Sequence, residues 1–147
     1  MRRVSATIEI ATEATDELVD ALARLLPQLS SSPPPSAHEL AEVIADGDSA
    51  LFIARVDGRI VGALTLIMFR IPTGLKAWIE DVVVDSSARG YGVGEALNRA
   101  ALERAADRGA KAVSLTSRSS REAANRLYQR IGFSIRDTNV YRYDLDG

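Results

Sequence analysis

The feature that most limits the fold of this chain is a run of valines that leads into a glycine-rich stretch. Residues 82–84 are β-branched and apolar, as is typical of a strand. Glycines follow at positions 90, 92 and 94, and an amphipathic helical pattern begins there. Glycines let successive backbone N–H groups converge at the positive end of a helix dipole without a side chain in the way. The stretch therefore predicts a loop that binds a phosphate or pyrophosphate; its structural alternative is a turn that only needs positive φ angles.

Two familiar phosphate-binding loops can be compared with this stretch. A P-loop needs Lys and Ser or Thr after its glycines, whereas Gly94 is followed by Glu95 and Ala96. A dinucleotide-binding fold needs the spacing G-x-G-x-x-G and an acidic residue about 20 positions further on. Here the spacing is G-x-G-x-G, and the next apolar segment ends at Thr116 and Ser117 without an acid. A Rossmann-type oxidoreductase is therefore a weak alternative.

Hydrophobic periodicity predicts the element order β-α-α-β-β-β-α-β-α-β-β. The expected strands cover residues 7–11, 50–56, 59–69, 77–84, 112–116, 133–135 and 140–145. The expected helices run from Leu18 to near Pro27, over the segment after Ser36, over residues 92–108, and from Ser119 to Ile131. Residues 77–116 form a β-α-β crossover, which is parallel and right-handed in such units. The fold class is therefore mixed α/β (α+β), mostly antiparallel with one parallel strand pair.

Short motifs mark several of the expected boundaries. Ser36 with Glu39, and Ser119 with Glu122, have the spacing of a capping box at a helix N-terminus. The dipeptide Asp57-Gly58 between two apolar runs is a strong signal for a two-residue β-hairpin.

Composition excludes several classes of protein. The chain has 147 residues, enough for a single domain over 1–147, and no cysteine, which excludes disulfides, thiolate metal sites and a cysteine nucleophile. Its single histidine, His38, leaves no basis for a histidine-rich metal site. A net charge of -2 argues against general nucleic-acid binding. No apolar run approaches the ~18 residues of a membrane span, and no signal segment follows Met1, so we expect a cytoplasmic protein without membrane contact.

Two motifs together resemble the GNAT superfamily of N-acetyltransferases over essentially the whole chain. The first is Arg89-x-x-Gly92-x-Gly94 after the valine-rich strand, and the second is the segment 124–133, which reads A-x-x-x-Y-x-x-x-G-F. The resemblance implies a mostly antiparallel sheet with a splayed parallel strand pair and flanking helices. It also implies acetyl-CoA as the acyl donor, no metal, and direct attack by a primary amine of a small molecule or peptide.

The resemblance also assigns roles to individual residues. Tyr128 protonates the leaving thiolate of CoA, and Glu80 is the candidate general base, since two-residue alternation places it on the same face as Val82 and Val84. Asn125 is a candidate ligand of pantetheine, because the usual asparagine position of the family is occupied here by Arg121. The remaining cofactor-binding positions are the pantetheine-pairing Val82, Val83 and Val84 and the pyrophosphate-binding Arg89, Gly90, Tyr91, Gly92, Val93, Gly94 and Glu95.

One alternative within the same fold is a non-catalytic acyl-CoA-binding module that regulates another protein. The presence of both the glycine motif and Tyr128 favours the enzyme. The identity of the acceptor amine and the oligomeric state, with a homodimer as one option, are left open by the sequence.

Overall fold

The computed structural model describes residues 5–146 of the chain. Its contacts divide the chain into two compact units, one up to Thr116 and one from Ser117 onward.

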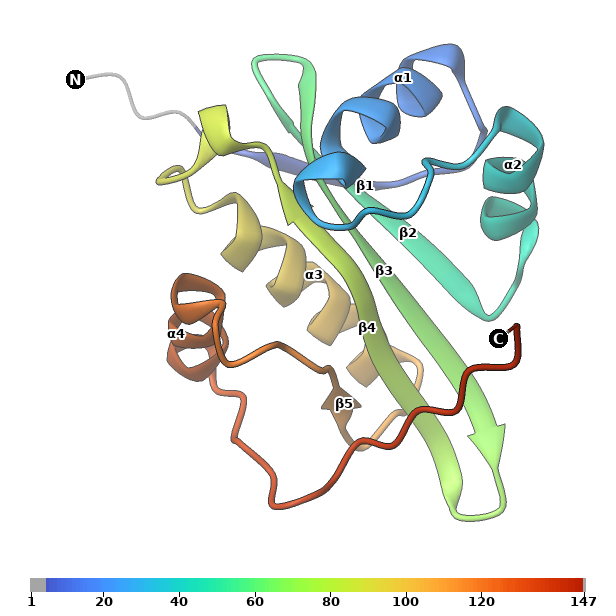
Figure 1. The fold of residues 1–147 in the computed structure, drawn as a ribbon, viewed down its shortest axis with the longest axis vertical. Coiled ribbons are helices and arrows are strands. Elements are labelled where there is room, and N and C mark those ends of the chain that lie inside the picture. The colour runs from blue at the N-terminus through green and yellow to red at the C-terminus, as the bar shows by residue number, and fades with distance from the viewer. Residues whose placement is uncertain (1–4, 147) are drawn as a thin grey trace. The chain divides into compact units, whose positions relative to one another are not determined.

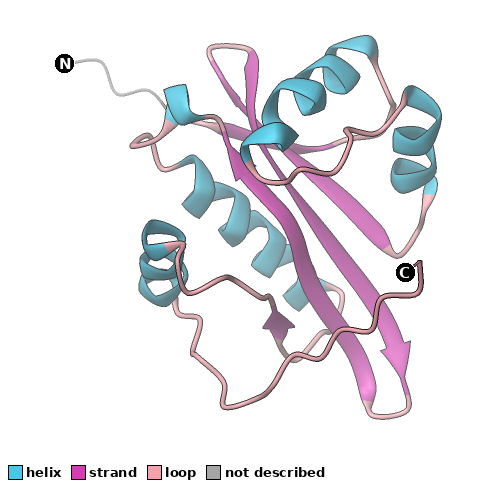
Figure 2. Ribbon diagram, in the orientation of Figure 1, coloured by secondary structure: helices cyan, strands magenta, loops and turns pink. Residues whose placement is uncertain are grey.

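The N-terminal unit contains a five-stranded sheet in the order β1-β2-β3-β4-β5 (Figure 2). Neighbouring strands are antiparallel except β4 and β5, which are parallel, as the sequence predicted. The strands are β1 (Thr7–Ile10), β2 (Ser49–Val56), β3 (Arg59–Ile71), β4 (Gly74–Val84) and β5 (Val113–Ser114). The helical segments are α1 (Asp16–Leu25), η1 (Leu26–Gln28), α2 (Ala37–Ala45), η2 (Ser86–Ala88) and α3 (Val93–Asp107).

The predicted capping box at Ser36 and the predicted hairpin turn at Asp57-Gly58 are both present in this unit. The Ser36 side chain accepts from the Glu39 backbone N–H at 3.2 Å, and the Glu39 carboxylate accepts from the Ser36 N–H at 3.0 Å, which completes the capping box of α2. Asp57 and Gly58 both have positive φ, 51° and 79°, as a type I′ turn between β2 and β3 requires.

Helices cover both faces of the sheet (Figure 1). On one face, leucines of α1 and α2 form a buried cluster with Leu51, Ile53, Ala63 and Val83. On the opposite face, α3 packs so closely that a Cβ on Gly62 would lie 3.0 Å from the side chain of Val93. The start of α3 is therefore held against the centre of the sheet.

The parallel pair is short and then opens. Only Ala77 with Val113, and Trp78 with Ser114, are in register between β4 and β5. Strand β4 continues to Val84, and residues 79–84 have no strand partner on this edge within the described chain. This is the splayed pair that the family resemblance implies.

The C-terminal unit contains helix α4 (Glu122–Ile131), which ends at Gly132 with a φ of 125°. The predicted capping box at Ser119 is wrong, because the N-cap is Arg121 and no side chain caps the helix. A turn closed by the Arg121 N–H on the Arg118 carbonyl, at 3.0 Å, occupies the segment where the helix was expected to begin.

The two closing strands predicted at 133–135 and 140–145 are also absent from the described chain, and Figure 2 draws this segment as loop. A strand needs the backbone of a neighbour, and alternating apolar residues alone do not supply one. The large apolar and aromatic side chains from Ile135 onward are exposed instead, with Tyr143 at 86% and Leu145 at 91%. No helix within residues 5–146 is long and apolar enough to cross a membrane.

Candidate active site

The connection from β4 to α3 begins with a turn whose backbone N–H groups are all used. The Asp85 N–H donates to the Val61 carbonyl at 2.7 Å, and its carboxylate accepts from the Ser87 N–H at 3.1 Å. The side-chain oxygen of Gln28 accepts from the Ser86 N–H at 3.1 Å, and the Ala88 N–H donates to the Asp85 carbonyl at 2.9 Å. These bonds hold the 3₁₀ turn η2 in place.

Asp85, whose bonds stabilise this turn, is buried, with 6% of its surface exposed. The hydrogen bond from the Ser87 backbone lowers the pKa of this carboxyl, with a smaller contribution from the Arg24 guanidinium 3.7 Å away. Arg24 in turn donates to the Ile60 carbonyl at 2.6 Å. Sequence reasoning missed Arg24, Gln28 and Asp85, although an Asp directly after a buried strand and before a glycine loop is a recognisable turn signal.

The next backbone N–H groups have no protein acceptor among the described residues. These N–H groups are those of residues 89–94. The first hydrogen bond of α3 runs from the Ala96 N–H to the Gly92 carbonyl, at 3.0 Å. No side chain caps α3. The first N–H groups of a helix have no intrahelical partner and carry the positive end of its dipole. The predicted loop thus presents a row of unpaired donors, and its binding of a phosphate stays a prediction.

Glycine is required in this loop by backbone conformation. Gly90 and Gly92 have φ angles of 92° and 74°, in the left-handed region, while a Cβ at either position would meet nothing within 4 Å. Arg89 and Tyr91 are exposed, and Arg89 has no ion-pair partner within the described chain. A guanidinium in this position suits a phosphate. Val93 is buried, and Glu95 accepts from the Arg99 side chain at 3.4 Å.

A β-bulge in β4 changes the predicted position of Glu80. Thr65 pairs with Glu80 but Gly62 pairs with Val84, so three residue steps along β3 match four along β4. Asp81, within this stretch, has a φ of 49°. Since Thr65 and Gly62 lie on opposite faces of β3, Glu80 and Val84 also lie on opposite faces. The expectation that they share one face is wrong. Glu80 is exposed on the face that carries the α1 and α2 cluster.

The open edge of β4 and the loop form one continuous run of backbone. Residues 79–84, which include Val82, Val83 and Val84, extend over about 20 Å of strand without a partner on the β5 side. The unpaired N–H groups of residues 89–94 follow after the turn at residues 85–88. An extended ligand that ends in a pyrophosphate could hydrogen-bond along the strand and place its charge on the loop.

In the C-terminal unit, Tyr128 is 7% exposed and contacts the ring of Phe133 edge-on, with centroids 5.7 Å apart. Burial raises the pKa of Tyr128, and the Arg121 guanidinium offsets part of that rise. A phenol with a raised pKa keeps its proton at neutral pH, as a general acid must. How Tyr128 faces the donor strand stays a prediction.

Asn125 is used within its own helix. Its side-chain nitrogen donates to the carbonyls of Arg118 and Arg121, both at 2.9 Å, which ties the turn before α4 to the helix. Only its side-chain oxygen is left to accept a bond from a ligand, so the role of Asn125 in binding pantetheine stays a prediction.

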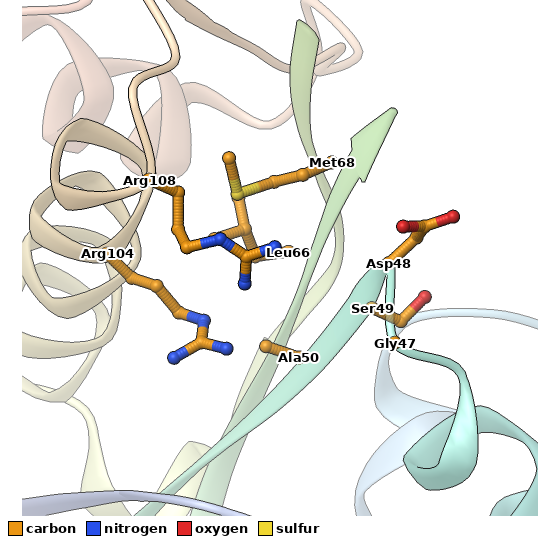
Figure 3. Close-up of a pocket in the computed structure, with 8 residues that line it drawn as sticks. All are labelled: Gly47, Asp48, Ser49, Ala50, Leu66, Met68, Arg104 and Arg108. Carbon is orange, nitrogen blue, oxygen red and sulfur yellow. The ribbon is translucent and has the colours of Figure 1, made fainter. Parts of the chain in front are cut away.

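Two other features lie outside this arrangement. His38 is exposed and lies 3.1 Å from the carboxylate of Glu42, one helical turn away. A small pocket lies between the β2–β3 region and the end of α3, where Arg104 and Arg108 extend from α3 toward the strand residues Ala50 and Leu66 (Figure 3). Because α3 has 15 residues, its two ends are about 22 Å apart, so this pocket is remote from the loop.

Comparison with known proteins identifies the family of this fold. Residues 15–133 match the model of the acetyltransferase (GNAT) family. The chain belongs to the GNAT family. It is therefore an N-acetyltransferase, and its mostly antiparallel sheet removes the Rossmann alternative.

Three relatives illustrate the range of this GNAT protein's similarity. It is 36% identical over 129 residues to a glucosamine 6-phosphate N-acetyltransferase of Trypanosoma brucei brucei, covering 82% of this chain and 85% of that one. It is 32% identical over 97 residues to N-alpha-acetyltransferase 30 of Schizosaccharomyces pombe, covering 65% and 64% of the two chains. The crystal structure of a Trypanosoma brucei acetyltransferase matches with a TM-score of 0.77 at 31% identity, covering 96% of this chain and 100% of that one.

Proposed function

We propose that this GNAT protein transfers the acetyl group of acetyl-CoA to a primary amine of a small molecule or peptide by direct attack. The observation that carries the proposal is the row of unpaired N–H groups at residues 89–94, which follows the open edge of β4 after one turn. The pyrophosphate binds the N–H groups of the loop together with Arg89, and the pantetheine pairs with the backbone of residues 82–84.

The residues assigned to proton transfer have chemistry that suits their tasks. Glu80 is an exposed carboxylate on β4, next to the open edge. It removes a proton from the ammonium group of the acceptor, directly or through a water molecule, so that the neutral amine attacks the thioester. Tyr128 is a buried phenol whose raised pKa keeps it protonated, and it delivers a proton to the departing thiolate. The acetyl carbon thus moves from sulfur to nitrogen, and CoA leaves as the thiol.

The test is an assay for free CoA with acetyl-CoA as the donor and a panel of amines as acceptors. The panel includes a hexosamine, a hexosamine phosphate, an arylalkylamine, a polyamine and a peptide with a free N-terminus. We expect CoA release that depends on one class of amine and falls at least tenfold in the Glu80→Gln variant. Release that is the same without any amine, or none with any of them, would contradict the proposal. A cytoplasmic location stays a prediction.

A further inference from the structure

The two faces of the sheet are buried to different extents along β3. On the face of α3, Gly62, Leu64, Leu66 and Met68 are all buried. On the other face, the cluster under α1 and α2 includes Ala63, but the next residues of that face, at positions 65, 67 and 69, are only partly buried. This part of the sheet, made by Thr65, Ile67, Phe69, Trp78 and Glu80, is called here the β3–β4 platform.

Trp78 lies at the position of the platform where β4 and β5 separate. It is the only tryptophan of the chain and lies opposite Ile67 of β3. Its other neighbour, Ser114, belongs to the last pair before β4 and β5 separate. By its register Trp78 therefore lies where the open edge of β4 begins, on the face of the platform.

Charge on the platform is arranged along β4. Glu80 is exposed two residues after Trp78 on the same face, and no cation pairs with it within the described chain. Lys76, opposite Phe69, lies at the other end of the platform. The carboxylate thus lies beside the open edge, and the aromatic and aliphatic side chains extend away from it.

We infer that the β3–β4 platform holds the acceptor, and that this acceptor is a primary amine with a flat, apolar body. The ammonium group binds at Glu80, where it loses its proton, and the flat body stacks on Trp78 and Ile67. Aromatic faces attract both flat apolar groups and cations. The inference rests on the proposed function, which it deepens by naming the class of acceptor and the residue that selects it.

The test compares phenylethylamine with propylamine, which have the same reacting group but differ in the flat body. We expect wild type to prefer phenylethylamine in kcat/KM by about tenfold or more, the usual range for one apolar group in a pocket. Trp78→Ala removes most of this preference, Trp78→Phe retains much of it, and both bind acetyl-CoA as wild type does. Ile71→Ala, at an apolar position 40% exposed near the end of the same hairpin, is the matched control and leaves the preference unchanged.

Fluorescence gives a second readout that needs no catalysis and no variant. Because Trp78 is the only tryptophan, phenylethylamine added to the protein with CoA should change its emission in a saturable way, and propylamine should not. An unchanged emission, or a Trp78→Ala variant with the wild-type preference, overturns the inference. So does a clear preference for glucosamine 6-phosphate over phenylethylamine. CoA release in any of these cases leaves the proposed function standing, whereas release with no amine at all contradicts the proposed function.

Discussion

The side-chain oxygen of Gln28 accepts a hydrogen bond from the backbone N–H of Ser86, 58 residues further along the chain, at 3.1 Å. The bond joins the end of η1 to the turn that precedes the unpaired N–H groups of the loop. An ion pair beside it, between the exposed Arg24 and the buried Asp85, joins α1 to the same turn. The first helical segment of the chain thus holds the start of the loop in position.

Replacing Gln28 with Leu should therefore weaken donor binding without affecting chemistry. One hydrogen bond contributes about 0.5–1.5 kcal/mol, so we expect the KM for acetyl-CoA to rise about 3- to 10-fold while kcat stays the same. Steady-state kinetics measure both. Gln129→Leu, an exposed glutamine on α4, is the control and should behave as wild type. An unchanged KM in Gln28→Leu would mean that the loop holds its shape without this bond.

Asp85→Asn should remove a pH-dependent part of the stability. The native state lowers the pKa of Asp85 below its ordinary value of 3.8, so its stabilisation is complete above that pH and is lost as the pH falls through the lowered pKa. Asn still accepts from the Ser87 N–H but lacks the charge beside Arg24, and we expect a loss of about 1 kcal/mol at neutral pH. Denaturant unfolding from pH 2 to pH 7 measures this. The difference in the free energy of unfolding between wild type and Asp85→Asn should disappear toward pH 2. A difference that stays constant with pH would contradict the lowered pKa of Asp85.

Gly92→Ala tests the left-handed conformation at the start of α3. A Cβ there meets no atom within 4 Å, so any loss comes from the φ of 74°, which costs an L-residue about 1–2 kcal/mol. We expect acetyl-CoA to bind at least tenfold more weakly by calorimetry. Gly47→Ala is the matched control, because a Cβ there is also in open space and its φ is outside the left-handed region. If Gly92→Ala and Gly47→Ala bind acetyl-CoA with equal affinity, the left-handed conformation at Gly92 is not needed for donor binding.

Tyr128→Phe tests the proposed general acid. Phe keeps the ring that contacts Phe133 and removes only the hydroxyl, so the fold should survive. General acids contribute about 10²- to 10⁴-fold, and we expect kcat to fall at least about 30-fold at pH 7 with little change in acetyl-CoA affinity. Because burial raises the pKa of Tyr128, the wild-type phenol stays protonated beyond its ordinary pKa of 10.0.

The pH profile gives the control for this variant. A thiolate can leave without a proton above about pH 9, so the deficit of Tyr128→Phe should shrink there. A variant within about threefold of wild type at pH 7, with chemistry shown to be rate-limiting, would make Tyr128 a packing residue.

Features set by neighbouring residues could be predicted from the sequence. The Ser36–Glu39 capping box, the Asp57-Gly58 turn and the glycine loop depend on backbone preferences within a few positions, and all three occur in the structure. The GNAT family was recognised from two such local motifs and the order of the elements between them.

Features set by distant partners could not be predicted. The bulge at Asp81 follows from the pairing of β4 with β3, and no residue type near it signals the extra position that turns Glu80 away from the face of Val84. The alternation at Val140 and Tyr141 is typical of a strand, but a strand forms only against a neighbouring backbone. The bond between Gln28 and Ser86 is likewise a product of the fold.

The central claim is that the N–H groups of residues 89–94 bind the pyrophosphate of acetyl-CoA. Calorimetric titration of the wild-type protein with acetyl-CoA, with S-acetylpantetheine and with NAD tests it, because S-acetylpantetheine keeps the thioester and lacks the pyrophosphate with its nucleotide, whereas NAD has a pyrophosphate and an adenosine but no pantetheine. We predict saturable binding of acetyl-CoA, binding of S-acetylpantetheine at least 100-fold weaker, and none of NAD. Equal affinities for acetyl-CoA and S-acetylpantetheine, or tighter binding of NAD, would contradict the claim.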